Sequence, residues 1–364
     1  MCILWLIAVT TMGRMAVDSS FPQLITLLLA GQDLTPDQAT WAMDSVMEGS
    51  VDPIALGGFL IALKAKGEKV EEIEAFTQAI ISHALPINVT REALDIVGTG
   101  GDRSGTVNIS SMSALVIAAA GVPVLKHGNR AASSRSGSSD FFEALGVDLQ
   151  TPPERVAEIF DKVGIGFCFA GLFHPGFRHA AATRKALGVP TVFNFLGPLC
   201  NPGRPRINAI GVAAEDRVQL VAGLLANRGD TALVFRGADG LDEMSTTGLN
   251  SVWQVSNGQM SHFTIDPQEL GFAPAELEDL VGGDAATNVA ISEGVFAGEP
   301  GSVRDVVLLN SAAGLVAALL YHEPETADQD LTERFANAVE VAAEAIDSGA
   351  AAAKRDQWLA EFTN

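Results

Sequence analysis

A glycine-rich loop over residues 98–102, with the sequence GTGGD, has the first set of residue types that could do chemistry. Hydroxyl and amide side chains follow it at short spacing, namely Thr106, Asn108, Ser110 and Ser111. Glycines let backbone N–H groups approach a ligand closely, and a helix that begins here adds unpaired N–H donors and a partial positive charge. A strand-to-helix turn without a ligand would need the glycines but not the polar side chains behind them. The loop therefore predicts a phosphate or diphosphate site, although its spacing is neither GxGxxG nor that of a P-loop.

A second polar loop begins with the run Lys126-His127-Gly128-Asn129-Arg130 and continues, rich in serine, to Asp140. It follows a short apolar run, and ligands of open α/β sheets bind where strands end. Lys126, Arg130 and Arg135 concentrate positive charge there in an otherwise acidic chain. A solvated loop would account for one or two of these charges, but the whole pattern favours a binding site.

Two adjacent carboxylates, Asp242 and Glu243, follow the apolar run 231–237 and a short turn. Magnesium in proteins is typically held by one or two carboxylates together with substrate phosphates. Two adjacent acidic residues on a loop, without other functional residues nearby, are most often simply exposed to solvent. Beside a diphosphate site, however, the pair predicts a magnesium site.

Arg184 is predicted to lie on a helix that ends near Gly188, ahead of the segment NFLGPLCNP at 194–202. A guanidinium group can hold a carboxylate through two parallel hydrogen bonds, so Arg184 is a candidate for binding an organic acid. A surface arginine without this role is the alternative. His174 and His179 have no carboxylate nearby at metal-ligand spacing, so we expect structural roles for both.

The elements that position these loops follow from hydrophobic patterns. Strands are predicted at 93–97, 122–127, 165–170, 207–213 and 231–237, with a hairpin at 252–265. Helical patterns separate most of these strands, which predicts an α/β fold with a mostly parallel sheet covered on both faces. Before residue 89 the pattern is helical, with a capping box from Thr35 to Gln38, and the last hundred residues are also mostly helical.

The composition excludes several classes of protein. The chain has 364 residues, of which 48% are hydrophobic and 18% charged, so it can bury a large core and is unlike a disordered protein. Its net charge of -21 opposes binding to nucleic acid. Cys2, Cys168 and Cys200 match no zinc or disulfide spacing, so we expect a reducing, cytoplasmic location, with Cys168 as a buried apolar residue.

The N-terminal segment 1–18 is expected to be an extension, disordered or absent from the native start, which Met12 or Met15 could provide. Its apolar run is too short for a membrane span and lacks the basic residues of a signal peptide. No other segment is expected to be long and apolar enough to cross a membrane.

The motifs DIVGTGGD, GTVNIS, KHGNRAAS and NFLGPLCNP, followed by the Asp242-Glu243 pair, stand in an order that resembles the anthranilate phosphoribosyltransferases. The resemblance covers about residues 20–355. It implies a nucleoside phosphorylase-like fold, in which residues 20–88 and about 178–205 form a small all-helical domain. Residues 89–177 and about 206–364 would then form a large α/β domain with a mostly parallel central sheet.

The resemblance also implies a reaction. The family transfers the 5-phosphoribosyl group from 5-phosphoribosyl diphosphate (PRPP) to the amine of anthranilate and releases diphosphate, which is the second step of tryptophan biosynthesis from chorismate. Two Mg²⁺ ions per subunit are expected, as is a homodimer that pairs through the small domain. No nucleic-acid or membrane partner is expected.

Residue roles follow from the resemblance position by position. The residues expected to bind PRPP are Gly98, Gly100, Gly101, Asp102, Thr106, Asn108, Ser110, Ser111, Lys126, Asn129 and Ser138. The residues expected at anthranilate are Gly98, His127, Asn129 and Arg184, and those at the metal are Ser110, Asp242 and Glu243. Ser111 stands where the family usually has threonine. The serine keeps the hydroxyl group and lacks only a methyl group, so the difference bears on substrate affinity and not on the reaction.

Two other functions fit the same architecture. A pyrimidine nucleoside phosphorylase would bind one phosphate rather than a diphosphate, and both the KHGN run and the acidic pair favour the transferase. A non-enzymatic relative that binds single-stranded nucleic acid would need a basic groove, which the net charge opposes.

Overall fold

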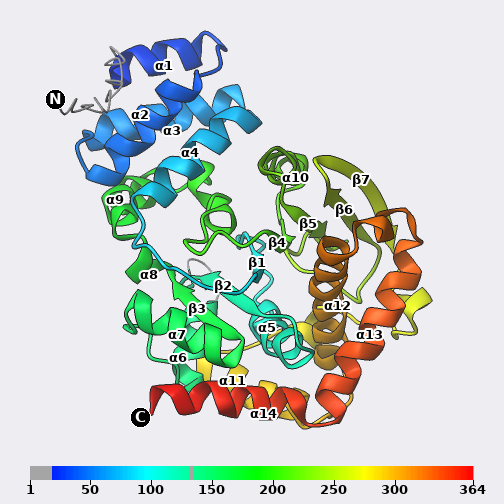
Figure 1. Ribbon diagram of the computed structural model, residues 1–364. Helices are drawn as coiled ribbons and strands as arrows, with labels where there is room; N and C mark the ends of the chain where they lie inside the picture. The colour runs from blue at the N-terminus through cyan, green and yellow to red at the C-terminus, as the bar shows by residue number, and fades with distance from the viewer. Residues whose placement is uncertain (1–18, 132–134, 364) are drawn as a thin grey trace, which may run out of the picture.

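The predicted capping box at Thr35 begins one of four N-terminal helices in the described residues. The computed structural model describes residues 19–131 and 135–363, so the predicted extension at 1–18 lies outside the described residues. The helices here are α1 (Phe21–Leu29), α2 (Pro36–Glu48), α3 (Pro53–Lys66) and α4 (Val70–Ser82). The hydroxyl of Thr35 accepts a hydrogen bond from Gln38 N–H at 3.3 Å, and the Asp52 carboxylate caps α3. These helices form a separate group at one end of the molecule (Figure 1).

A seven-stranded sheet within the described residues has the strand order β3-β2-β1-β4-β5-β6-β7. The strands are β1 (Leu94–Gly98), β2 (Val124–Gly128), β3 (Ile165–Phe169), β4 (Ile207–Gly211), β5 (Thr231–Arg236), β6 (Asn250–Ser256) and β7 (Gln259–Ile265). Strands β1 to β5 are parallel, whereas β6 and β7 form an antiparallel hairpin. Asn257 and Gly258 make its turn with positive φ angles, as a two-residue hairpin requires. The predicted fold, a helical group beside a mostly parallel α/β sheet, is confirmed.

The two faces of the sheet have different helical covers. Leu94 and Ile96 of β1 share an apolar core with α5 (Ile109–Ala119) and α12 (Ser302–His322). Val97 points to the other face and shares a core with α10 (Glu215–Arg228) and the N-terminal helices. Burial on both faces is the reason why these strands are almost continuously apolar. The other helices are α6 (Ser138–Leu145), α7 (Pro153–Val163), α8 (Ala170–Phe173), α9 (Arg178–Leu187), α11 (Ala285–Phe296), α13 (Leu331–Asp347) and α14 (Ala350–Leu359).

Helix α12 corrects one expectation from the sequence. The expectation that no segment beyond the N-terminus is long and apolar enough to cross a membrane is wrong, because α12 meets both criteria. In the structure, 78% of its most apolar stretch is buried inside the protein, where it packs against α5, α13 and the sheet. A helix that is surrounded by protein in this way is apolar on all sides.

Helix α9 returns the chain to the N-terminal helices. It packs against α2 and α3, and its Ala180 is fully buried in their core. The prediction that residues 178–205 complete the small helical domain stays a prediction, which this packing supports.

Candidate active site

Two glycines at the carboxyl ends of neighbouring strands make room for a carboxylate. Gly98 of β1 pairs with Gly211 of β4, at the point where the sheet order reverses and where open α/β sheets bind ligands. The side chain of Asp242 lies over this pair and accepts a hydrogen bond from Gly100 N–H at 2.6 Å. A Cβ atom at Gly98 would overlap the Asp242 carboxylate, and one at Gly211 would overlap its backbone carbonyl.

Three carboxylates share this end of the sheet. Asp242 and Glu243 are both buried, and Asp102 is close enough to interact with each of them. Burial, together with the neighbouring Asp102, raises the pKa of Asp242 to about 7. Burial and the charge of Asp242 likewise raise the pKa of Glu243 well above its usual range. Such a cluster is costly without a cation, so its chemistry suits a hard divalent ion.

Lys126 supplies the fixed positive charge of the site. Its side chain is only 1% exposed, and its Nζ donates hydrogen bonds to the carbonyl of Ile96 and, at 3.1 Å, to Ser110 Oγ. Burial lowers its pKa, while the charges of Asp95 and Glu243 oppose that shift. The N–H of Ser110, in the first turn of α5, donates to Glu243. The amino end of α5, the lysine and the acidic pair are therefore held together.

A buried carboxylate, Asp95, supports the next residue along β2. It accepts hydrogen bonds from His127 N–H at 3.1 Å and from Asn201 Nδ2 at 2.9 Å. Burial raises the pKa of Asp95 to about 6, although Lys126 opposes the shift. The sequence analysis missed this residue, although a carboxylate in the middle of the apolar strand LDIVG was the signal for it.

His127 is held in one tautomer. Its Nδ1 lies 3.1 Å from the carbonyl oxygen of Gly197, and because that oxygen can only accept, Nδ1 carries the hydrogen. The Nε2 atom is then an acceptor, and it is buried without a hydrogen-bond partner among the described residues. Burial and the neighbouring His174 hold the pKa of His127 well below its usual range, so the ring is neutral.

A row of ring contacts connects His127 with Arg184. His127 meets His174 edge-on at 5.1 Å between ring centroids, His174 meets Phe177 at 5.3 Å, and Phe177 meets Phe193 at 5.9 Å. The guanidinium of Arg184 lies 5.4 Å from the centre of the Phe193 ring. No carboxylate of residues 19–131 or 135–363 pairs with Arg184, and burial lowers its pKa. A half-buried cation without a counter-ion beside aromatic rings suits an aromatic carboxylate.

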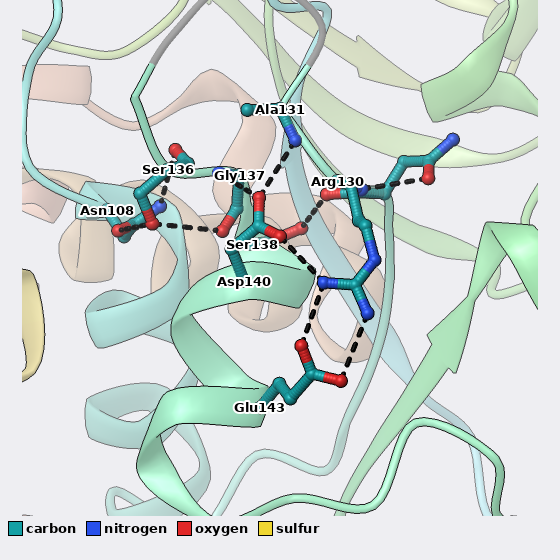
Figure 2. Close-up of polar contacts among 9 residues, drawn as sticks. Asn108, Arg130, Ala131, Ser136, Gly137, Ser138, Asp140 and Glu143 are labelled. Carbon is teal, nitrogen blue, oxygen red and sulfur yellow. Dashed lines mark hydrogen bonds and ion pairs between the residues drawn. The ribbon is translucent and has the colours of Figure 1, made fainter. Parts of the chain in front are cut away.

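The loop after β2 is held by the Asp140 carboxylate at the start of α6 (Figure 2). Asp140 Oδ2 accepts hydrogen bonds from Ala131 N–H at 3.0 Å and Gly137 N–H at 2.9 Å, so it joins the two ends of the loop. Its Oδ1 accepts from Arg130, which also forms two hydrogen bonds with Glu143. The ends of the loop are thus fixed beside Ser138, whose hydroxyl donates to Asn129 O at 3.4 Å.

Comparison with known proteins shows which family has this arrangement. The helical bundle domain of the glycosyl transferase family matches residues 22–84, and the a/b domain of that family matches residues 90–352. An anthranilate phosphoribosyltransferase from Leifsonia xyli subsp. xyli (strain CTCB07) is 56% identical over 346 residues, which cover 95% of this chain and 99% of that protein. The chain belongs to the anthranilate phosphoribosyltransferase family.

Solved structures of anthranilate phosphoribosyltransferases have the same fold. The enzyme from Thermus thermophilus is 40% identical, with a TM-score of 0.85 over 94% of this chain and 99% of that one. The enzyme from Saccharomyces cerevisiae in complex with PRPP and Mg is 26% identical, with a TM-score of 0.84 over 95% of this chain and 98% of that one.

Part of the set of residues that the family resemblance points to converges at the carboxyl ends of β1, β2 and β4. Contacts or electrostatic interactions join Gly98, Gly100, Asp102, Ser110, Lys126, Asp242 and Glu243. Asn108 joins the two loops, because its side chain exchanges hydrogen bonds with Ser136 at 3.1 and 3.2 Å.

The other residues of the set lie outside these contacts. Asn129 and Ser138 contact each other in the second loop, and His127 and Arg184 lie at the two ends of the row of rings. Gly101 has a φ of 93°, which suits the loop, and Thr106 pairs through its backbone with Val281, but neither forms a hydrogen bond with the others in the described structure. Ser111 is 1% exposed within α5, and its hydroxyl has no partner there. Besides Asp95, the sequence analysis also missed Gly211, Asn201 and Asp140, which support the site.

Replacing Gly98 with alanine is expected to lower kcat/KM about a hundredfold, because the new methyl group displaces the Asp242 carboxylate. Gly57→Ala is the matched control, since a Cβ atom there makes only ordinary contacts at 3.6 and 3.8 Å. Steady-state kinetics and thermal unfolding of both variants test this. Near-normal activity of a folded Gly98→Ala protein would show that Asp242 does not need this position.

Asp140→Ala is expected to raise KM for PRPP about tenfold or more, because two backbone N–H groups and Arg130 lose their acceptor. Glu143→Gln is the control, since it removes the other charge on Arg130 but leaves the backbone contacts in place. Kinetics with each substrate varied in turn test this. An equal change of KM for PRPP in both variants would assign the effect to Arg130 instead.

Proposed function

We propose that this chain transfers the 5-phosphoribosyl group from PRPP to the amine of anthranilate and releases diphosphate, the second step of tryptophan biosynthesis from chorismate. The observation that carries the proposal is the meeting of the glycine loop, Lys126 and the buried Asp242-Glu243 pair at one end of the sheet. Arg184, which pairs with no carboxylate of the described residues, is linked to His127 through a row of ring contacts, which supports an acceptor site there. Membership of the family supports the same activity.

The diphosphate side of the site is assigned to the two polar loops. Backbone N–H groups of the glycine loop and of the first turn of α5 would bind the diphosphate, with Lys126 as the fixed cation. The remaining residues given this role are Gly98, Gly100, Gly101, Asp102, Thr106, Asn108, Ser110, Ser111, Asn129 and Ser138. The proximity of Lys126 to Ser110, and of Asn129 to Ser138, supports these assignments.

Magnesium would be held by Asp242 and Glu243, with Ser110 at a second ion. The relative from Saccharomyces cerevisiae was solved with PRPP and Mg, and the crowded carboxylates of this chain fit that ion. Because Mg²⁺ in proteins usually combines one or two carboxylates with substrate phosphates, diphosphate oxygens would complete the coordination. Bound Mg²⁺ neutralises charge on the departing diphosphate.

The protein's own residues provide positioning and electrostatic stabilisation. As the bond from C1 to diphosphate breaks, the leaving group gains negative charge, which Lys126 and the N–H donors stabilise without rearranging. The aromatic amine is neutral and already nucleophilic, so it needs alignment with C1 rather than a strong base. Arg184 would bind the anthranilate carboxylate, and the unpaired Nε2 of His127 offers an acceptor for an amine N–H.

A homodimer that pairs through the small domain is also proposed. Leu29, Ile54 and Ile61, on α1 and α3, are exposed by 72%, 86% and 40%, which leaves an apolar surface on these helices. Cytoplasmic location is proposed because Cys168 and Cys200 are buried free thiols. The burial of Cys168 agrees with its predicted role as an apolar core residue.

The experiment that tests the activity follows anthranilate fluorescence with purified protein, PRPP and Mg²⁺, and repeats the assay with EDTA. A loss of fluorescence that needs both PRPP and Mg²⁺ is expected. Thymidine and uridine with phosphate provide the control for phosphorolysis. A folded protein that leaves anthranilate unchanged would contradict the proposed acceptor.

A further inference from the structure

A cavity lies at the opposite end of the strands from the candidate active site. Its volume is about 520 Å³, which is in the range of small-molecule sites. It lies between the last turn of α4, the segment 198–208 that leads into β4, and the end of α10. Arg206 and Asp230 immediately precede β4 and β5, so this cavity is at the amino ends of the strands, whereas the active site is at their carboxyl ends.

Positive charge is concentrated in this cavity, in a chain whose net charge is -21. Arg204, Arg206 and Arg228 line it, and Asp230 is the one carboxylate among the lining residues. Asp230 pairs with Arg206, Nε to Oδ1 at 2.9 Å. Arg228 uses its Nη1 and Nη2 groups to donate to Leu199 O and Thr77 Oγ1. Arg204 makes no ion pair with any described residue, so its guanidinium is available to an anion.

The rest of the lining is apolar or amide. The apolar part of the wall is formed by Ile81, Pro198, Leu199 and Leu225. The amide of Asn208 is buried among the lining residues. Small-molecule sites combine such apolar walls with a few charged groups that fix orientation. We propose that this cavity binds an organic anion, whose carboxylate or phosphate is held by Arg204 and Arg206 and whose apolar body lies against the wall.

The cavity wall is continuous with the segment that supports His127. Leu199 and Asn201 line the cavity, while Gly197, two residues before Leu199, accepts the hydrogen bond from His127 Nδ1. The amide of Asn201 also donates to Asp95 Oδ2 and, at 2.8 Å, to Leu125 O. The proposed ligand would therefore lie against the back of the segment that positions the acceptor side of the active site.

The test observes the arginine side chains of the full chain directly. Protein labelled with [¹⁵N]arginine is titrated with benzoate, phenyl phosphate and the neutral analogue benzamide, and the Nε–Hε resonances of Arg184, Arg204 and Arg206 are followed after assignment by substitution. The resonances of Arg204 and Arg206 are expected to shift together as an anion is added, with a Kd of about 1 mM for at least one of the two anions. Benzamide, which has no charge, is expected to leave both resonances unchanged. The anion that binds more tightly distinguishes a carboxylate ligand from a phosphate ligand.

Two variants separate this site from the active site. The Kd for the anion, measured from the shift of the Arg206 resonance, should be unchanged in Arg184→Ala. In Arg204→Gln the same Kd should rise about tenfold, because one charged donor is lost. Resonances of Arg204 and Arg206 that do not move, or whose shifts disappear in Arg184→Ala, would overturn the proposal. A shift of Arg184 alone would support the proposed acceptor site and exclude the second one.

Discussion

Asp242→Asn is expected to lower kcat/KM about a thousandfold and to weaken activation by Mg²⁺, because a carboxylate at the junction of β1 and β4 is lost. The same change should raise the thermal midpoint of the metal-free protein. Burial, and secondly the charge of Asp102, make the ionised form of Asp242 unfavourable, so an uncharged asparagine avoids both costs. Steady-state rates at varied Mg²⁺ and thermal unfolding in EDTA measure both effects.

A matched control lies in the same loop. Asp239 is exposed and its side chain accepts a hydrogen bond from Thr247, which asparagine can also accept, so Asp239→Asn should retain both activity and Mg²⁺ dependence. If Asp242→Asn keeps the wild-type response to Mg²⁺, the metal does not use this carboxylate. A loss of activity together with a lower thermal midpoint would instead indicate a damaged fold.

Arg184→Ala is expected to raise KM for anthranilate about a hundredfold, while KM for PRPP changes little. The guanidinium is half-buried over the Phe193 ring and has no carboxylate partner within the described part of the chain, so a substrate carboxylate would form its ion pair. Loss of a two-pronged, charge-assisted contact costs about 3 kcal/mol, which corresponds to that factor. Fluorescence assays with each substrate varied separately measure the two constants.

Two further variants identify the reason for the effect. Lys185→Ala removes the charge next to Arg184 on the same helix and should leave both KM values near those of the wild type. Arg184→Lys keeps the charge but loses the planar pair of donors, so it should recover only part of the affinity. Wild-type KM for anthranilate in Arg184→Ala would place the acceptor carboxylate elsewhere.

The local structure of this chain follows from its sequence. Thr35 caps a helix at the predicted position, and Asn257-Gly258 turns the predicted hairpin. These features depend on contacts within a few residues and on the backbone freedom of glycine and asparagine, which a sequence displays directly. The glycine loop, Lys126 and the Asp242-Glu243 pair could likewise be proposed as a site, because each motif carries its own chemistry at short spacing, and the structure brings them together.

The supporting residues of the site could be found only from the tertiary structure. Gly211 matters because β4 pairs with β1, and Asp95 because its carboxylate meets the backbone of β2 and the amide of Asn201. These partners lie between 32 and 106 residues from Asp95 in the chain. The buried state of α12, a helix apolar enough to suggest a membrane span, was also decided by packing. Helix capping and turn formation depend on residues that are neighbours in the sequence, so the sequence determined them. Burial and strand pairing depend on residues that are far apart in the sequence, so only the tertiary structure decided them.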